Sequence, residues 1–344
     1  MDKIQVGNLQ MGKNCPILIQ SMLSTPNGDV TAAIKQADAL ERAGCHILRL
    51  AVPDLEALPV IEALKKYTKM PIVADIHFDY KLALAAVDAG VDKIRINPGN
   101  IGADDVIEAV ATKCKTNNIP IRVGVNGGSL EKNILKKYGA PTAEALVESA
   151  LYHTSLLEKF DFHNIVVSMK SSDVVNMVRA YRLLAQKKDY LLHIGVTEAG
   201  PGKRGLVKNA IGIGSLLLDG IGNTIRVSLT DDPIEEIYAA KHILGGLGLL
   251  SNEPQLISCP TCGRTKIDLI SLAGEVEKLL KDVHKPIKVS VMGCVVNGPG
   301  EAREADIGVA GGDGVGLIFK HGEPLCKVPY DEILKYLKAE IDKL

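Results

Sequence analysis

Residues 72–97 read IVADIHFDYKLALAAVDAGVDKIRIN. A short run rich in β-branched residues comes first, a helical stretch that ends near Gly90 follows, and a second apolar run starts at Lys93. Short apolar runs bounded by Gly, Pro, Asn or charged residues are typical of parallel strands that are buried on both faces. The stretch therefore predicts one strand–helix–strand unit.

The same unit recurs through the first two-thirds of the chain. Its helical patterns include Thr31–Ala43, Ala103–Lys115, Thr142–Lys159, Asp173–Lys187 and Pro233–Leu244, the last with proline in its first turn after two aspartates. The predicted strands are Ile17–Met22, Ile47–Val52, Ile72–His77, Lys93–Asn97, Ile121–Asn126, Ile165–Met169, Leu191–Thr197 and Thr224–Leu229.

Eight such units in about 250 residues match the size of a closed (β/α)8 TIM barrel. An open doubly wound sheet is the alternative. It is less favoured, because the units number eight and no GxGxxG motif follows the first strand. The sequence therefore predicts a TIM barrel as the substrate-binding domain, over residues 1–250.

The pattern changes near Leu250–Pro254, where GLGLLSNEPQ has the composition of a linker. A small α+β domain is predicted over residues 251–344. It begins with a cysteine pair, and its elements are a helix at about Lys266–Lys281, strands near Ile287–Val291, Asp306–Val309 and Gly316–Phe319, and a last helix at about Tyr330–Lys343. We therefore expect an α/β chain of two domains.

Composition excludes several classes of function. The chain has 344 residues, 40 basic and 41 acidic side chains, and a formal net charge of −1, so no global field attracts nucleic acid or an anionic membrane. The N-terminus has no apolar core of signal-peptide length, and the most apolar stretch, Ile211–Ile221, is too short to span a membrane. We therefore expect a cytoplasmic protein, in which the seven cysteines do not form disulfides.

Polar residues stand at the carboxyl ends of the predicted strands, where TIM barrels place their chemistry. Four strands each carry an arginine, although a buried guanidinium without a partner is costly. If the four point into the barrel mouth, they converge on one anion, and their planar forks suit phosphate oxygens. The bland alternative is that each arginine pairs with a neighbouring carboxylate. The residues concerned are Arg49, Asp75, His77, Arg95, Asn97, Arg122, Asn126, Ser168, Lys170, Glu198, Arg226 and Ser228.

Two glycine-rich loops and one carboxylate complete this rim. Gly127–Gly128 and the segment Gly200–Gly205 could present backbone N–H groups to a phosphate, although glycine also simply makes turns. Glu198 stands among cations and is the acid/base candidate. Asp75 and His77 are weaker candidates, because a His beside an Asp is often a structural pair.

The cysteines fall into two groups. Cys15, Cys45, Cys114 and Cys326 are scattered and are expected to be buried structural thiols. Cys259 and Cys262 form a CxxC turn, and Cys294 supplies a third thiol. A zinc site is one interpretation, but a zinc ribbon needs a second CxxC, which the chain lacks. An iron–sulfur cluster is the second, and its fourth ligand could be Cys326 or the closer Glu301. Three unrelated thiols are the third interpretation.

These motifs resemble a known family. CPTCGR, MGCVVNGPGEAREADIGVAGG, HIGVTEAG, IRVGVNGGSL and IRINPGN occur in the order seen in the bacterial 4-hydroxy-3-methylbut-2-enyl diphosphate synthases of the non-mevalonate isoprenoid pathway. The resemblance covers nearly the whole chain. It implies a cytoplasmic iron–sulfur oxidoreductase of terpenoid biosynthesis that opens the ring of 2-C-methyl-D-erythritol 2,4-cyclodiphosphate by a two-electron reduction with loss of water. Flavodoxin or ferredoxin is the implied electron donor.

The resemblance also implies roles for individual residues. Glu198 matches the acid on the barrel side, and Asn297 matches a residue close to the open corner of the cluster. The implied ligands of a [4Fe–4S] cluster are Cys259, Cys262, Cys294 and Glu301. The implied diphosphate-binding residues are Arg49, Arg95, Arg122, Asn126, Lys170, Arg226 and Ser228.

The implied assembly is a homodimer, in which the cluster domain of one subunit acts on the barrel of the other. The principal alternative is a redox-inactive transferase with a pteroate-synthase-like barrel and a structural zinc site, and a non-enzymatic iron–sulfur carrier is the second. The transferase would hold zinc and no chromophore, whereas the carrier would leave the arginine-lined rim without a role.

Overall fold

The computed structural model describes residues 3–250, 252–281, 283, 285–295 and 302–344. The chain divides into two compact units, Met1–Leu249 and Leu250–Leu344. Within the described residues, no helix is both long and apolar enough to cross a membrane.

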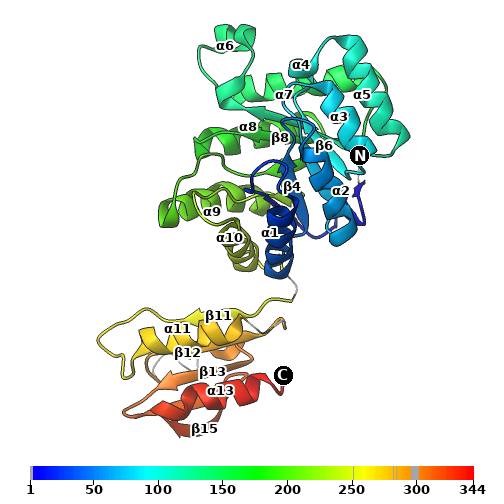
Figure 1. Cartoon of the computed structure of the whole chain (residues 1–344). Helices are drawn as coiled ribbons and strands as arrows, with labels where there is room; N and C mark the ends of the chain where they lie inside the picture. Colours follow the sequence, from blue (N-terminus) through cyan, green and yellow to red (C-terminus); the bar gives the residue numbers. More distant parts are fainter. Residues whose placement is uncertain (1–2, 251, 282, 284, 296–301) are drawn as a thin grey trace. The chain divides into compact units, whose positions relative to one another are not determined.

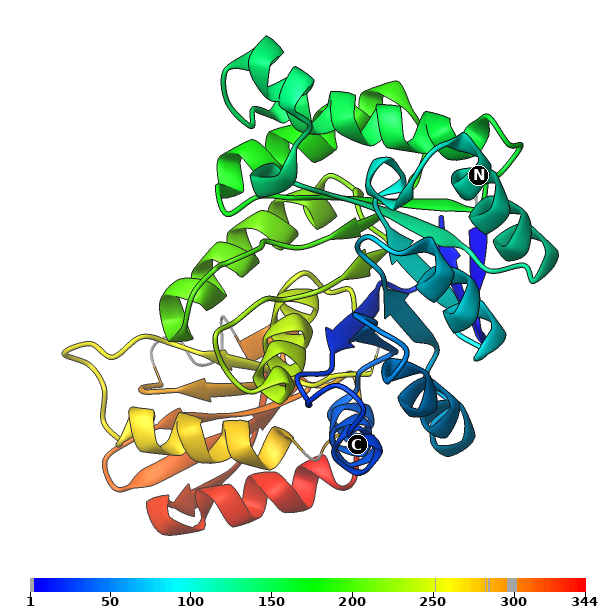
Figure 2. The same cartoon turned by 45° about the horizontal axis from the view of Figure 1, so that its top comes forward.

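The first unit is a closed barrel of eight parallel strands in the order β10-β3-β4-β5-β6-β7-β8-β9, so the predicted fold class is confirmed. Helices surround the strands in both views (Figures 1 and 2). The strands are β3 (Leu18–Met22), β4 (Ile47–Ala51), β5 (Ile72–Asp75), β6 (Lys93–Ile96), β7 (Ile121–Asn126), β8 (Ile165–Lys170), β9 (Leu191–Ile194) and β10 (Thr224–Ile225).

The helices of the first unit alternate with these strands. They are α1 (Val30–Ala43), α2 (Ala57–Tyr67), α3 (Tyr80–Asp88), α4 (Pro98–Ile101), α5 (Asp104–Thr116), α6 (Lys132–Tyr138), α7 (Ala143–Glu158), α8 (Val174–Lys187), α9 (Gly202–Leu218) and α10 (Pro233–Gly246). Asp29, Thr142 and Asp173 cap α1, α7 and α8 through their side chains, so local sequence determines where these helices start.

Several strands end earlier than predicted. The sequence predicts β10 through Leu229 and β9 through Thr197, but the ladders stop at Ile225 and Ile194. Val196 and Val227 are nevertheless buried, because the segments that follow the strands continue into the barrel mouth. The sequence predicts these strands as too long, because buried β-branched residues continue past the last hydrogen bond of each ladder.

A β-hairpin precedes the barrel and was not predicted. β1 (Lys3–Val6) and β2 (Leu9–Gly12) pair antiparallel through a turn in which Gly7 has a φ of +57°. Ile4, Val6 and Met11 pack in one cluster with Leu18, Ile47, Val73, Val166 and Leu191, which lie at the start of their strands. The hairpin therefore closes the amino end of the barrel.

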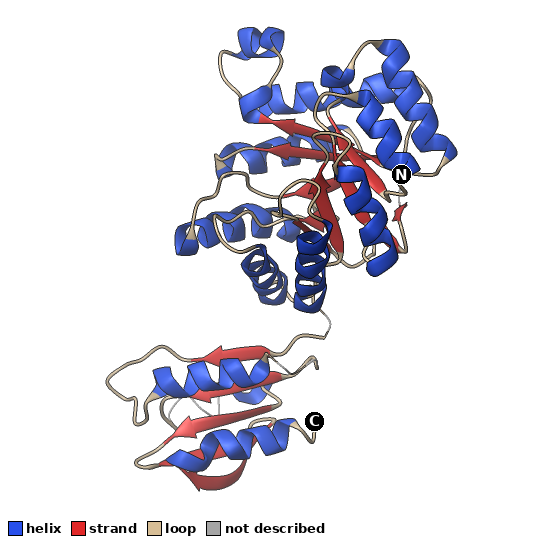
Figure 3. Cartoon of the chain, in the orientation of Figure 1, coloured by secondary structure: helices blue, strands red, loops and turns tan. Residues whose placement is uncertain are grey.

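In its described residues, the second unit is a five-stranded sheet with two helices (Figure 3). The order is β11 (Gln255–Ser258), β12 (Lys288–Met292), β13 (Ile307–Gly311), β14 (Val315–Lys320) and β15 (Glu323–Pro329). The first three strands are parallel and the last two pair antiparallel. The edge strands β11 and β15 were not predicted, because one is a four-residue run between the predicted linker and the cysteine pair and the other is polar and poorly buried.

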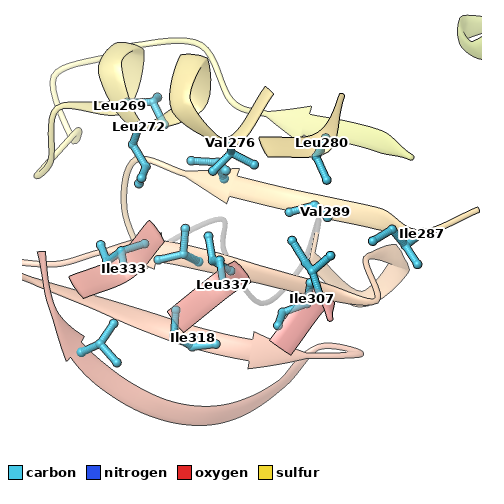
Figure 4. Close-up of a cluster of buried hydrophobic side chains, with 14 residues drawn as sticks. Leu269, Leu272, Val276, Leu280, Ile287, Val289, Ile307, Ile318, Ile333 and Leu337 are labelled. Carbon is cyan, nitrogen blue, oxygen red and sulfur yellow. The ribbon is translucent and has the colours of Figure 1, made fainter. Parts of the chain in front are cut away.

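Both helices of this unit pack on one face of its sheet (Figure 4). α11 (Leu269–Leu280) contributes Leu272 and Val276, and α13 (Ile333–Ile341), which follows a 3-10 turn, contributes Leu337. They meet Val289 and Val309 from the sheet. The second unit therefore has a hydrophobic core of its own.

Tyr181 links the outer helices to the barrel. Its buried hydroxyl donates to the His193 carbonyl (2.6 Å) and accepts from the Met169 amide (2.9 Å). We expect Tyr181→Phe to lower the free energy of unfolding by about 1–3 kcal/mol, because it leaves the buried Met169 N–H unsatisfied. Urea unfolding measures this, with Tyr152→Phe, an exposed tyrosine, as the control. Equal losses in the two variants would contradict it.

Candidate functional site

Asp75 organises two of the predicted rim arginines. It lies at the end of β5, where its Oδ2 meets Arg49 Nη2 at 2.5 Å and its Oδ1 meets Arg95 Nη1 at 3.1 Å. His77 Nε2 lies 3.3 Å from the same Oδ2. The neighbouring Arg49 and Arg95 guanidinium groups hold the pKa of Asp75 well below its usual range, against the effect of burial. Asp75 is therefore ionised and fixes both arginines.

Arg122 has no carboxylate partner among the described residues. It is 1% exposed, and its Nη1 donates to Ser168 Oγ at 3.2 Å. Its Nε and Nη2 are buried without a hydrogen-bond partner. Because an unpaired buried guanidinium is costly, this arrangement points to an absent anion.

Arg226 is held from the outer helices. Its Nη2 lies 3.6 Å from Glu236 Oε1 on α10, and the same oxygen accepts from the Leu229 amide. Asn209 on α9 bonds Ser228 through both backbone groups: its Nδ2 donates to the Ser228 carbonyl at 2.9 Å, and its Oδ1 accepts from the Ser228 amide at 3.3 Å. Glu236 and Asn209 thus position the segment after β10 that carries Arg226 and Ser228.

Lys170 shows that the four arginines converge. It ends β8 in register with Asn126, which ends β7. Burial lowers the pKa of Lys170 well below its ordinary value, and the charges of all four arginines lower it further. The described side chains at the mouth include five bases, Arg49, Arg95, Arg122, Lys170 and Arg226, with Lys93 deeper in the barrel, but two carboxylates, Asp75 and Glu236. The barrel mouth therefore has an excess of positive charge that suits a multiply charged anion.

Glu198, in the loop after β9, and Asn126, the last residue of β7, lie at the same end of the barrel. Glu198 is exposed, and its backbone is left-handed, with a φ of +52°. This conformation costs a non-glycine residue about 1–3 kcal/mol and is concentrated at functional sites. Asn126 is followed by a 3-10 turn, Gly127–Ser129, and the other predicted glycine-rich segment forms the start of α9. Asn97 is buried at the end of β6, next to the short α4.

The sequence identified most of these residues but not Lys93, Asn209, His193 or Glu236. Arg49 and Arg95 pair with Asp75, and Arg226 pairs with Glu236. For these three arginines, the structure therefore shows the alternative in which each arginine pairs with a neighbouring carboxylate. This pairing does not account for Arg122, for Lys170 or for the excess of positive charge in the barrel mouth. An anion-binding site is therefore still needed to explain them. The residues that the sequence did not identify lie deeper in the barrel or on outer helices. Their positions cannot be inferred from where the strands end.

The grouped cysteines lie at one edge of the second unit's sheet. Cys259 follows β11 and Cys294 follows β12, and these neighbouring strands are parallel. The Gly293 amide donates to Cys259 Sγ at 3.2 Å, which places the Cys259 thiol beside the peptide that leads to Cys294. Cys262 is exposed, and the pKa of its thiol is lowered, first by a backbone hydrogen bond from Arg264. N–H donors aimed at sulfur favour thiolate, the form that binds iron.

The other ligand candidates differ in position. Asn297 and Glu301 lie outside the described residues. Cys326 lies on β15, four strand positions from β11, which is about 19 Å at the usual strand spacing. In the part of the chain that is described, no three His, Cys, Asp or Glu side chains are grouped to hold a metal ion. Sheet topology thus separates Cys326 from the other three thiols.

The scattered cysteines correspond in part to the expectation of buried structural thiols. Cys45 and Cys114 are buried, and burial raises the pKa of each thiol to about 12. Cys15 and Cys326 are half-buried. Neither Cys45 nor Cys114 is therefore a thiolate at neutral pH.

Comparison with known proteins identifies both units. The GcpE TIM-barrel domain matches residues 1–241, and the GcpE protein C-terminal domain matches residues 255–343. A protein of Geobacillus thermodenitrificans named 4-hydroxy-3-methylbut-2-en-1-yl diphosphate synthase (flavodoxin) is 56% identical over 341 residues, which is 99% of this chain and 91% of the relative. A Clostridium perfringens protein of the same name is 56% identical over 342 residues, covering 99% and 98%.

Among solved structures, dihydropteroate synthase of Yersinia pestis resembles the barrel. The TM-score is 0.50 at 13% identity, and the match covers 72% of this chain and 98% of that one. A likeness at this identity concerns the barrel fold alone.

Proposed function

The chain belongs to the GcpE family, and from this membership we propose that it catalyses the reductive ring opening of 2-C-methyl-D-erythritol 2,4-cyclodiphosphate to (E)-4-hydroxy-3-methylbut-2-enyl diphosphate. The reaction takes up two electrons, releases water and belongs to the non-mevalonate route to isoprenoids. Relatives that are 56% identical over nearly the whole chain carry the name of this flavodoxin-dependent synthase. The alternative of a pteroate-synthase-like transferase with a structural zinc is not favoured, since that likeness is limited to the barrel.

The observation that carries the proposal is the unbalanced positive charge of the barrel mouth. We assign the diphosphate to Arg49, Arg95, Arg122, Asn126, Lys170, Arg226 and Ser228. As the ring C–O bond breaks, negative charge grows on the departing diphosphate oxygen. Fixed cations that require no reorganisation stabilise this charge in a water-poor site. Asp75 keeps Arg49 and Arg95 in place during this step.

Glu198 is proposed to give a proton to the oxygen that leaves as water. Its exposed carboxyl stands on a strained turn after β9, at the same end of the barrel as the arginines. A general acid must lie within hydrogen-bond reach of the group that it protonates, and the loops at the strand ends are where TIM barrels carry such groups.

The redox cofactor is proposed to be a [4Fe–4S] cluster on the second unit. Cys259, Cys262 and Cys294 would hold it, with Glu301 as the fourth ligand and Asn297 nearby. The thiol set fits, because two of its sulfur atoms already have N–H donors and all three thiols follow neighbouring strand ends. When bound, such a cluster would relay the two electrons of the reaction, one at a time, from the reduced electron donor to the substrate.

The proposed setting follows the family. Reduced flavodoxin or ferredoxin is the electron donor, the enzyme works in the cytoplasm, and neither nucleic acid nor membrane takes part. The active form is a homodimer in which the cluster unit of one subunit serves the barrel of its partner.

Anaerobic turnover tests the function directly. Protein purified without oxygen is mixed with the cyclic diphosphate and chemically reduced flavodoxin, and the linear diphosphate is measured by mass spectrometry, together with iron, sulfide and zinc. About four iron and four sulfide per chain with turnover are expected. One zinc, no sulfide and no turnover would leave an anion-binding barrel without the reductase activity.

We expect Arg122→Met to weaken the binding of inorganic pyrophosphate by roughly 10- to 100-fold, because charge-assisted hydrogen bonds contribute about 1.5–3 kcal/mol each. Isothermal titration calorimetry measures the dissociation constant. Arg42→Met is the matched control, since Arg42 is exposed on α1 and pairs with Asp38. Unchanged binding in the Arg122 variant would remove Arg122 from the anion site.

A further inference from the structure

Lys93 lies inside the barrel, below the rim arginines. It starts β6, is fully buried, and its Nζ has no hydrogen-bond partner among the described residues. Lys93 and Arg95 are two residues apart on one strand, so their side chains share a face. Arg95 points inward, where it meets Asp75, and Lys93 therefore points inward as well, about 7 Å closer to the amino end.

The charges that surround Lys93 are positive. After burial, the groups that act on it are Arg122 on β7 and Arg49 on β4, and His193 on β9 lies within range of its charge. Arg95 shares its strand. The neighbouring strand β5 carries Asp75, which is bound to Arg49 and Arg95, and the second interior carboxylate, Glu236, is paired with Arg226.

These surroundings disfavour an ammonium ion. A buried charge without a partner is costly, and nearby like charges add to the cost. Together they lower the pKa of Lys93 from 10.5 to about 7. Above that pH the empty barrel holds Lys93 as a neutral amine. A bound polyanion reverses the local field, which favours the protonated form.

We propose that Lys93 is a buried proton acceptor of the anion site, so that a diphosphate bound at the carboxyl end of the barrel draws one proton onto Lys93 Nζ without contacting it. The inference rests on the proposed diphosphate site. The proton comes from solvent and adds to the amine lone pair, and no other bond changes. The site thus acquires its full positive charge only when the anion is present, and loses part of it when the anion leaves.

Lys170 has a different part in the same site. Its pKa is also lowered, but it ends β8 beside Asn126, among the residues assigned to the diphosphate. Its ammonium group is expected to touch the anion. Substitution of Lys170 therefore removes a contact, whereas substitution of Lys93 removes a proton-binding position behind the contacts.

Proton counting on the intact protein tests the inference. Inorganic sulfate is the probe, because it does not titrate between pH 6 and 8, and calorimetry in buffers of different ionisation enthalpy gives the protons taken up per sulfate. At pH 8 the wild type is expected to take up about one proton more than Lys93→Met, and at pH 6 this difference should vanish, since a pKa of about 7 leaves Lys93 already protonated there.

Two further variants define the comparison. Lys113→Met, a surface lysine paired with Asp88, should match the wild type in proton uptake and affinity. Lys170→Met should bind sulfate roughly tenfold more weakly at both pH values. If Lys93→Met does not fold, Lys93→Gln takes its place, and circular dichroism verifies the fold.

Equal proton uptake by the wild type and a folded Lys93 variant at pH 8 would overturn the inference and leave the diphosphate site intact. Absence of sulfate and pyrophosphate binding to the wild type would overturn both the inference and the diphosphate site. The turnover assay with the cyclic diphosphate reports on the proposed function independently of either result.

Discussion

Asp75→Asn is expected to lower the free energy of unfolding by about 3–5 kcal/mol, the usual loss when one partner of a buried ion pair is removed. Asp75 is 2% exposed and holds both Arg49 and Arg95. Asparagine has nearly the same shape but no charge. The two guanidinium groups then face each other and the remaining interior cations without compensation.

Urea unfolding at pH 7 measures this loss, and Asp38→Asn is the matched control. Asp38 pairs with Arg42 on the surface of α1, where such a pair contributes at most about 1 kcal/mol. The Asp75 variant should also bind pyrophosphate more weakly, because Arg49 and Arg95 lose their fixed positions. An unfolding free energy within 1 kcal/mol of the control would show that the arginines do not depend on Asp75.

The same carboxylate predicts how stability depends on pH. Its pKa is depressed in the folded state, so its contribution is fully present above the unfolded value of about 3.9 and is lost as the pH falls below that value. The difference in unfolding free energy between the wild type and Asp75→Asn should therefore shrink between pH 5 and pH 2.

Cys259→Ser is expected to abolish turnover and to reduce bound iron and sulfide from about four each to near zero. Serine removes the sulfur that already accepts a hydrogen bond from Gly293 and lies at the shared edge of β11 and β12. A hydroxyl at this position is a poor iron ligand at neutral pH. Iron and sulfide assays on protein purified without oxygen give the result, together with the anaerobic turnover assay.

Cys326→Ala and Cys15→Ser are the controls for this experiment. Cys326 lies on the opposite edge strand from the three grouped thiols, so its loss should leave the iron content unchanged. Cys15 belongs to the barrel unit and should behave in the same way. Loss of iron in Cys326→Ala with retention in Cys259→Ser would require a different ligand set from the one proposed here.

The barrel could be predicted from sequence because each strand is a short apolar run that ends at a turn signal. Eight repeats of that pattern, with capped helices between them, leave few alternatives. The hairpin β1–β2 escaped prediction because it lies outside the repeat and each of its strands has four residues. β15 escaped because most of its residues are exposed, and an edge strand gives a weak hydrophobic signal.

The site was predictable only in part. The rim residues stand at strand ends, which can be located along a sequence. The partners of these residues depend on register: Asp75 lies opposite Arg95 across β5 and β6, and no local pattern reports this pairing. Lys93 was predicted only as the first residue of a strand, and the sequence did not reveal that the fold buries it completely.

The hairpin that closes the amino end of the barrel has a kinetic consequence. Its apolar residues Ile4, Val6 and Met11 pack over the starts of the strands, so the polar mouth that is proposed to bind the substrate lies at the other end. Substrate therefore enters and product leaves at the carboxyl end of the barrel, one after the other. A diphosphate product that dissociates slowly delays the binding of the next substrate molecule. The rate of product release at that end, as well as the rate of the chemical steps, therefore sets an upper limit on the turnover rate.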